Sequence, residues 1–142
     1  MKKAIVTGEK ERVGAWVAQR VGQSGQWANF EAIGLEQGGK LVAGVVFDSY
    51  VAGARCCMHV AGEGGTWLNR EYLRVCFDYA FQQMGCQVVI GLVSANNQPA
   101  LRFDEHLGFQ EVARIPNGSG DCDLVVLAMQ RKMCRWLNMK RG

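Results

Sequence analysis

Residues 94–109 read SANNQPALRFDEHLGF and carry the start and stop signals of one short helix. Asn96 or Asn97 can cap the first turn by accepting a backbone N–H, and Pro99 falls where a helix needs no donor. Gly108 can adopt the left-handed conformation that ends many helices. These signals predict a helix from about residue 97 to about 107. Helical spacing places three side chains on its inward face: Ala100, Phe103 and Leu107.

A short apolar run, CQVVIGLV at residues 86–93, precedes this helix and is typical of a buried strand. Across the chain, apolar periodicity and glycine-containing turns predict the element order β α β β β α β α β β. The longer elements are helices near 9–23 and 67–84 and strands near 28–37, 40–48, 54–60 and 88–94. A right-handed crossover through the second helix makes the last two of these strands parallel, and they should diverge at their C-terminal ends. We therefore expect an α/β domain with a mixed, twisted sheet of about six or seven strands and helices on both faces.

The composition fits one globular domain, because 142 residues with 49% hydrophobic and 20% charged side chains can bury a sizeable core. No stretch approaches the roughly 20 apolar residues of a membrane span, and no signal-peptide core follows the first lysines. The six cysteines form no C-x-x-C pair and lie in apolar patterns. This usage predicts reduced core thiols in a cytoplasmic protein without a membrane partner.

Positive charge is concentrated at the C-terminus. The last 12 residues hold five of the 16 Lys and Arg and none of the 13 acidic residues. We therefore divide the chain into a domain at 1–130 and a basic tail at 131–142. A basic tail with Trp136 could contact nucleic acid or anionic lipid, or it could be a solvated terminus or dock on its own domain. The near-neutral body of the chain argues against nucleic acid as the partner.

The segment LVSANNQPALRFDEHLGF resembles the end of the coenzyme A site in the GNAT superfamily of acyl-CoA-dependent N-acyltransferases. Its members often read Asn-x-x-Ala-x-x-x-Tyr-x-x-x-Gly-Phe there. Asn97, Ala100, Gly108 and Phe109 match at the same spacing, and Asp104 stands in the Tyr position. The resemblance implies a GNAT-like fold and transfer of an acetyl group from acetyl-CoA to a primary amine by direct attack in a ternary complex, with no metal.

The loop expected to hold the coenzyme pyrophosphate departs from the family pattern of Gln/Arg-x-x-Gly-x-Gly/Ala. Its glycines come early, and Trp67 and Asn69 hold the usual small positions. Backbone N–H groups at a helix N-terminus can still bind phosphate, and Arg70 can add charge-assisted bonds. Alternatively, the loop is only a flexible turn with Thr66 as N-cap. The implied coenzyme-binding residues are Met58, Val60, Gly65, Thr66, Trp67, Leu68, Asn69, Arg70 and Asn97.

The catalytic candidates follow from the same resemblance. Position 104 is where the family's Tyr protonates the thiolate, so either an apolar pocket raises the pKa of Asp104, or water protonates the thiolate and Asp104 pairs with Arg102 or Arg74. His59 is a base near the thioester or a core histidine. Three other side chains could contact substrate: Glu31 and Glu36 as bases on the acceptor side, and Ser94 as a hydrogen-bonding group.

The acceptor is expected to be a small amine or an amine-bearing peptide. Too few residues separate the helix near 9–23 from the next strand for a second helix, which predicts an open cleft. Carboxylates at Glu31 and Glu36 would favour a cationic amine there. The chain could form a homodimer. The alternative function is that of a GNAT-like domain that has lost catalysis and binds a ligand or partner.

Overall fold

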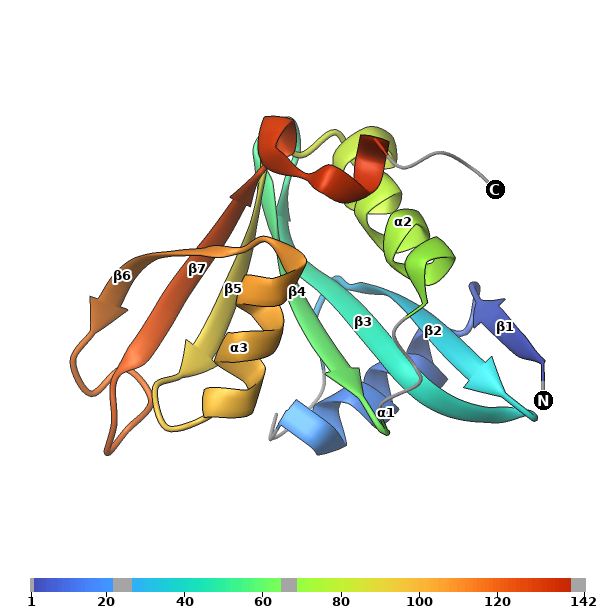
Figure 1. The fold of residues 1–142 in the computed structure, drawn as a ribbon, viewed down its shortest axis with the longest axis horizontal. Helices are drawn as coiled ribbons and strands as arrows, with labels where there is room; N and C mark the ends of the chain where they lie inside the picture. Colours follow the sequence, from blue (N-terminus) through green and yellow to red (C-terminus); the bar gives the residue numbers. More distant parts are fainter. Residues whose placement is uncertain (1, 22–26, 65–68, 139–142) are drawn as a thin grey trace.

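The computed structural model describes residues 2–21, 27–64 and 69–138. Seven strands form one sheet in the order β1-β2-β3-β4-β5-β7-β6 (Figure 1). The strands are β1 (Lys3–Val6), β2 (Glu31–Gln37), β3 (Lys40–Val51), β4 (Arg55–Gly62), β5 (Val88–Ser94), β6 (Gln110–Ile115) and β7 (Leu124–Gln130). The helices are α1 (Lys10–Val21), α2 (Arg70–Asp78), α3 (Gln98–Leu107), a π-helical turn η1 (Tyr79–Gln83), and the 3-10 turns η2 (Arg131–Met133) and η3 (Arg135–Asn138). The predicted mixed α/β sheet is confirmed.

One pair of neighbouring strands is parallel, and it is the predicted pair β4 and β5. Their pairing covers only Arg55–Cys57 against Val88–Ile90. Beyond these residues the two strands separate toward their C-terminal ends, which Figure 1 shows as an open V. The predicted divergence is confirmed, and it leaves backbone groups at the end of β4 without a partner strand on that side.

Helix α1 covers one face of the sheet, and α2 and α3 cover the other (Figure 1). Val13 and Val17 of α1 are fully buried. A Cβ on Gly44 of β3 would lie 2.6 Å from Cγ2 of Val17, so the glycine allows the helix to pack directly on the backbone of the sheet. The β2–β3 hairpin turns through Gly38 and Gly39, whose positive φ angles of 61° and 82° suit the predicted tight turn.

Helix α2 has a side-chain cap at its start. Asn69 caps it, because its side-chain oxygen accepts the backbone N–H of Tyr72 at 3.0 Å, and the first helical residue is Arg70. The predicted start near residue 67 lies outside the described residues. The end of the predicted helix is close to the observed one: Gly85, with φ 72°, follows the π-helical turn. The buried side of α2 carries Tyr72, Leu73, Cys76 and Phe77.

Helix α3 has the predicted ends. Asn97 caps its first turn, and Gly108 adopts the left-handed conformation at its C-terminus. The predicted inward face is partly wrong, since Leu101 and Leu107 are the buried residues. Ala100 and Phe103 are only partly buried and line the space between α3 and the diverging strands. The helix is rotated in this way because one side of it faces the gap in the sheet and not the core.

The described part of the C-terminal segment docks on its own domain, one of the alternatives that the sequence left open. Cys134 and Trp136 are buried. The indole N–H of Trp136 donates to the carbonyl of Leu107 at 2.8 Å, and its ring stacks on Phe77 with centroids 6.4 Å apart. Cys134 and Trp136 therefore belong to the core on the α2 and α3 side of the sheet.

The six cysteines are free thiols, and four of them are buried: Cys56, Cys76, Cys86 and Cys134. Burial raises the pKa of the Cys56 and Cys76 thiols, which disfavours their reactive thiolate forms. Among the described helices, none is long and apolar enough to cross a membrane.

Candidate active-site cleft

A cleft of about 420 Å³ opens where β4 and β5 diverge. One wall is the end of β4, from Met58 to Gly62, and the other is the end of β5, from Leu92 to Ser94. The first two turns of α3 close one side of it, and Arg20 and Val21 from the end of α1 lie at the other. Residues from β4, β5, α3 and α1, together with Leu124 of β7, therefore line one space.

A second hollow, of about 590 Å³, lies at the opposite end of the sheet. It is lined by Gln82, Gln87, Gln130, Arg131, Lys132, Cys134 and Leu137. Arg131 donates to the side chain of Gln82 at 2.5 Å there. No carboxylate or histidine is among the described residues around it, so the cleft between β4 and β5 is the better candidate for acid–base chemistry.

The cleft connects the two faces of the sheet. Met58 belongs to the core beneath α2, whereas its neighbour His59 faces the α1 side, because successive strand residues point to opposite faces. On β5, Gly91 faces α3, since a Cβ there would lie 3.4 Å from Oδ2 of Asp104. Asp104 and His59 therefore line the same cleft from opposite faces of the sheet.

Asp104 is partly buried in the second turn of α3. No described side chain is hydrogen-bonded to its carboxylate, and no ion pair links it to Arg102 or Arg74; Arg74 pairs instead with Glu71. The predicted arginine partner is therefore wrong. Burial without a compensating charge raises the pKa of Asp104 from 3.8 to about 7. The direction of this shift is the one that the alternative prediction gave, and its cause is burial.

His59 forms a hydrogen bond with a residue that the sequence did not single out. Its Nε2 lies 2.8 Å from Oδ1 of Asp48 on β3, and each side chain is 19% exposed. The ring also packs against Trp27, with centroids 4.7 Å apart. Val46 is the direct partner of His59 across the β3–β4 pair, so Asp48, two residues further along, shares the same face. Only the strand register brings the two side chains together.

The other catalytic candidates are dispersed. Ser94 lines the cleft, and its hydroxyl is 2.8 Å from that of Ser119. Glu31 lies 3.9 Å from Nζ of Lys10, and Glu36 pairs with Arg12; neither lines the cleft. Both are on β2, which β3 separates from the diverging strands.

The predicted coenzyme-binding residues divide into two groups. Met58, Val60 and Asn97 line the cleft. Asn97 uses its side-chain oxygen to accept the N–H of Ala100 at 3.3 Å, which leaves its amide N–H groups for a ligand. Asn69 is the α2 cap, and Arg70 is exposed in the first turn. Gly65, Thr66, Trp67 and Leu68 lie outside the described residues.

Solved structures share this architecture over nearly the whole chain. The spermidine N-acetyltransferase SpeG from Vibrio cholerae, in complex with CoA and spermine, has a TM-score of 0.70 and 12% identity over 92% of this chain and 96% of that one. YncA from Salmonella typhimurium, with its cofactor acetyl-CoA, has a TM-score of 0.69 and 17% identity over 90% and 93%. The ribosomal-protein-S18-alanine N-acetyltransferase from Escherichia coli has a TM-score of 0.64 and 20% identity over 91% and 94%.

These structures are all acetyltransferases of the GNAT fold, and the chain therefore has that fold, as the motif ending in Gly108 and Phe109 indicated. No protein-family model matches the sequence, and no curated protein matches it either.

Proposed function

We propose that this protein is an N-acetyltransferase that moves an acetyl group from acetyl-CoA to a primary amine by direct attack in a ternary complex. One observation carries the proposal. Beyond Cys57 and Ile90 the two central strands separate. The cleft between them is lined on one face by the carboxyl group of Asp104, which pairs with no described side chain, and on the other by a histidine, His59. An acid and a base on opposite sides of the reacting bond accelerate direct transfer between two bound substrates.

The residues around the cleft fit acetyl-CoA, which would supply the acetyl group as a reactive thioester. Backbone groups of β4 after Cys57 lack a partner strand on the β5 side and can hydrogen-bond an extended ligand arm. The amide N–H groups of Asn97 can do the same. The positive side chain of Arg70 stands in the first turn of α2, where backbone N–H groups also favour phosphate.

Asp104 is proposed as the proton donor to the departing thiolate. A carboxyl group with a pKa of about 7 remains partly protonated at neutral pH, whereas an ordinary aspartate is ionised. Oδ2 of Asp104 would lie 3.4 Å from a Cβ added to Gly91, so the carboxyl group is close to the β5 wall of the cleft. An acid here replaces the Tyr that the family resemblance places at the same position.

His59 is proposed as the base on the α1 face. The amine nitrogen forms a bond to the acetyl carbon while the carbon–sulfur bond breaks. The proton lost by the amine goes to His59, and the thiolate takes its proton from Asp104. Solvent then restores both groups to their starting states. Ser94, with its hydroxyl at the cleft, is proposed to hydrogen-bond one of the substrates.

The acceptor is proposed to be a small amine or the amine of a peptide. The predicted attraction of a cationic substrate by Glu31 and Glu36 has no support in their positions, since both carboxylates pair with cations of α1. Among the described residues of the cleft, Asp104 is the one carboxylate. A strongly polycationic acceptor would therefore gain little affinity from the charges of the cleft. An amine beside an apolar or neutral group suits the cleft better.

Location and assembly remain predictions. Six free thiols suit the reducing cytoplasm. A homodimer could use the outer strand β6, all six residues of which are exposed. The docking of Trp136 gives no support to nucleic acid as a partner of the C-terminal segment.

The alternative is a GNAT-like domain that binds a ligand or partner without catalysis. The departure of Trp67 and Asn69 from the family's glycine pattern favours it. The two candidates differ in what acetyl-CoA does. An enzyme should be stabilised by acetyl-CoA and should release free thiol when an amine is added.

The test combines thermal unfolding with a thiol-release assay. Acetyl-CoA well above its Kd should raise the Tm by several degrees. Monoamines, spermidine and short peptides with free N-termini should then be screened as acceptors, with Asp104→Asn as the matched control that keeps the shape of the side chain. If acetyl-CoA stabilises the protein but no amine causes thiol release, the result supports the binding module. If acetyl-CoA does not stabilise the protein, it is not a ligand of this chain under either candidate function.

A further inference from the structure

The hydrogen bond between His59 and Asp48 fixes both the position of the imidazole ring and the nitrogen that carries its hydrogen. A carboxylate only accepts hydrogen bonds, so the 2.8 Å contact requires Nε2 of His59 to carry the hydrogen. In the neutral ring the lone pair is then on Nδ1. Among the residues that the structure describes, none is hydrogen-bonded to Nδ1. The pair therefore leaves a single nitrogen of His59 able to take a proton.

We propose that Asp48 is a positioning residue that holds His59 in the Nε2–H tautomer, with Nδ1 as the atom that accepts the proton of the attacking amine. The proposal rests on the N-acetyltransferase function proposed above. Asp48 does not line the cleft, whereas His59 does, so Asp48 acts through the histidine and not on the substrate.

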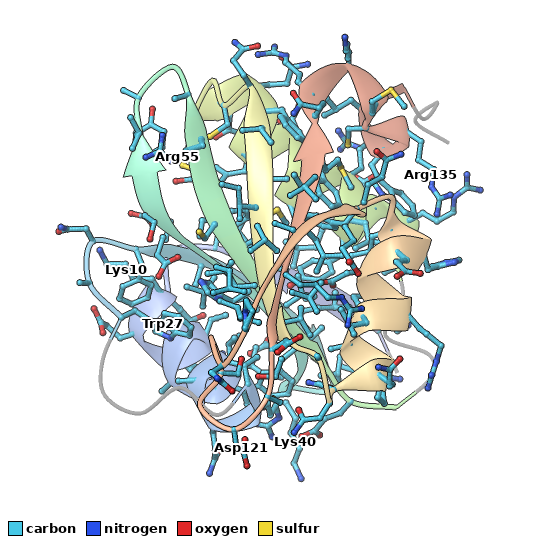
Figure 2. The ribbon with its side chains drawn as sticks, turned by 90° about the vertical axis from the view of Figure 1, so that its left-hand side faces the viewer. Lys10, Trp27, Lys40, Arg55, Asp121 and Arg135 are labelled. Atoms are coloured by element: carbon cyan, nitrogen blue, oxygen red, sulfur yellow. The ribbon has the colours of Figure 1, made fainter. Side chains whose placement is uncertain are left out.

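Other contacts restrict the ring in the same orientation. Trp27 packs on it at 4.7 Å with the two ring planes 44° apart. The indole N–H of Trp27 in turn donates to the carbonyl of Gly14 at 2.8 Å, which anchors it to α1 (Figure 2). A ring held between Trp27 and Asp48 has little freedom to flip, so the hydrogen bond with Asp48 decides which nitrogen is protonated.

Apart from His59, no described cation forms an ion pair with the carboxylate of Asp48. Arg20, which reaches the cleft from α1, pairs with Glu63. Cys57 lies beside Asp48 on β4; burial first, and the negative charge of Asp48 second, raise the pKa of its thiol, so it stays a neutral neighbour. The strand itself becomes irregular directly after Asp48, where Ser49 has a φ of 54°. Asp48 is thus the last regular residue of β3 on this face, and its hydrogen-bond partner there is His59.

The test reads the tautomer directly by ¹⁵N NMR of the imidazole ring. The chain has two histidines, and His106→Gln assigns the signals of His59. The wild-type ring should be the Nε2–H tautomer. In Asp48→Asn the amide can donate to Nε2, so a substantial fraction of the Nδ1–H tautomer should appear. Asp48→Glu keeps a carboxylate and should retain the Nε2–H form.

The kinetic part uses a double-mutant cycle with the amine identified by the thiol-release screen. Asp48→Asn should lower kcat about tenfold or more with little change in the KM for acetyl-CoA, and Asp48→Glu should recover part of the loss. In a His59→Gln background, Asp48→Asn should cause no further loss, because Asp48 acts through the histidine.

Results of two kinds in these experiments would overturn the proposed role of Asp48. An Nδ1–H tautomer in the wild type, or an unchanged tautomer in Asp48→Asn, overturns the proposal whether or not the protein turns over any amine. Losses that multiply in the double variant overturn it as well. If no amine is acetylated but the tautomer behaves as expected, the proposed function fails while the role of Asp48 in setting the ring stands. Thermal unfolding of each variant checks that it is folded.

Discussion

The carboxylate of Asp104 on α3 faces Gly91 on β5, so closely that a Cβ added to the glycine would lie 3.4 Å from Oδ2. The glycine leaves room beside a group whose burial already raises its pKa to about 7. This contact across the helix–strand boundary brings an ionisable group into the gap between β4 and β5, and it leads to the first prediction.

Gly91→Ala should raise the pKa of Asp104 further. The added methyl group fits at ordinary contact distance, and it displaces water from the carboxylate, which disfavours the charged form. The ¹³C NMR titration of the Asp104 carboxyl carbon should show a midpoint above that of the wild type. A midpoint that moves to lower pH would mean that water or a polar group, and not apolar burial, surrounds this carboxylate.

Asp104→Asn should lower kcat about 100-fold while leaving the affinity for acetyl-CoA nearly unchanged, because an amide cannot give up a proton to the thiolate. In the wild type, the protonated fraction of Asp104 falls as pH rises above about 7, so its contribution to kcat should decline there. This decline should be absent in Asp104→Asn. If Asp104→Asn has the wild-type kcat and pH profile, water and not Asp104 protonates the thiolate.

The stability of the protein should depend on pH through the same residue. The folded-state pKa of Asp104, about 7, is above its value of 3.8 in the absence of burial, so between these values the folded state binds more protons than the unfolded state. The free energy of unfolding should therefore fall as pH rises from about 4 to 7, by at most about 4 kcal/mol from this group. Urea unfolding at several pH values should show that this component is missing in Asp104→Asn. An identical pH dependence in both proteins would contradict the raised pKa.

Arg70→Glu should weaken acetyl-CoA binding about tenfold at low salt, because it reverses a charge beside the proposed phosphate position, and the effect should shrink as salt screens it. Arg55→Glu is the matched control. Arg55 is an exposed arginine at the start of β4, at the end of the sheet remote from the cleft (Figure 2). Isothermal titration calorimetry at two salt concentrations measures the affinity of both variants for acetyl-CoA. Equal losses in the two variants would mean that only the net charge of the protein matters.

Trp136→Ala should lower the free energy of unfolding by about 3 to 5 kcal/mol, the usual cost of removing a large buried aromatic side chain. Trp136 is 6% exposed and stacks on Phe77. Met133 provides the control, since it belongs to the same segment and is 61% exposed. Met133→Ala should change stability by less than about 0.5 kcal/mol. If urea unfolding shows little loss of free energy of unfolding in Trp136→Ala, the segment after Gln130 is an independent tail.

The sequence by itself determined the order of the elements and the ends of α3. Its caps, Asn97 and Gly108, satisfy backbone groups within a few residues, and such signals depend on local chemistry alone. The parallel pairing of β4 and β5 was also predictable, because the handedness of a crossover through α2 leaves one arrangement. The acidic residue in the Tyr position, Asp104, is visible in the sequence as a departure from the family pattern.

Only the tertiary structure decided what these residues contact. The strand register placed Asp48 beside His59, and the position of β2 away from the gap placed Glu31 and Glu36 in ion pairs outside the cleft. Likewise, the raised pKa of Asp104 depends on its burial and on the absence of an ion pair with any described residue, which no spacing along α3 encodes. Burial and electrostatics sum over neighbours that are distant in the sequence, whereas helix caps and strand periodicity do not.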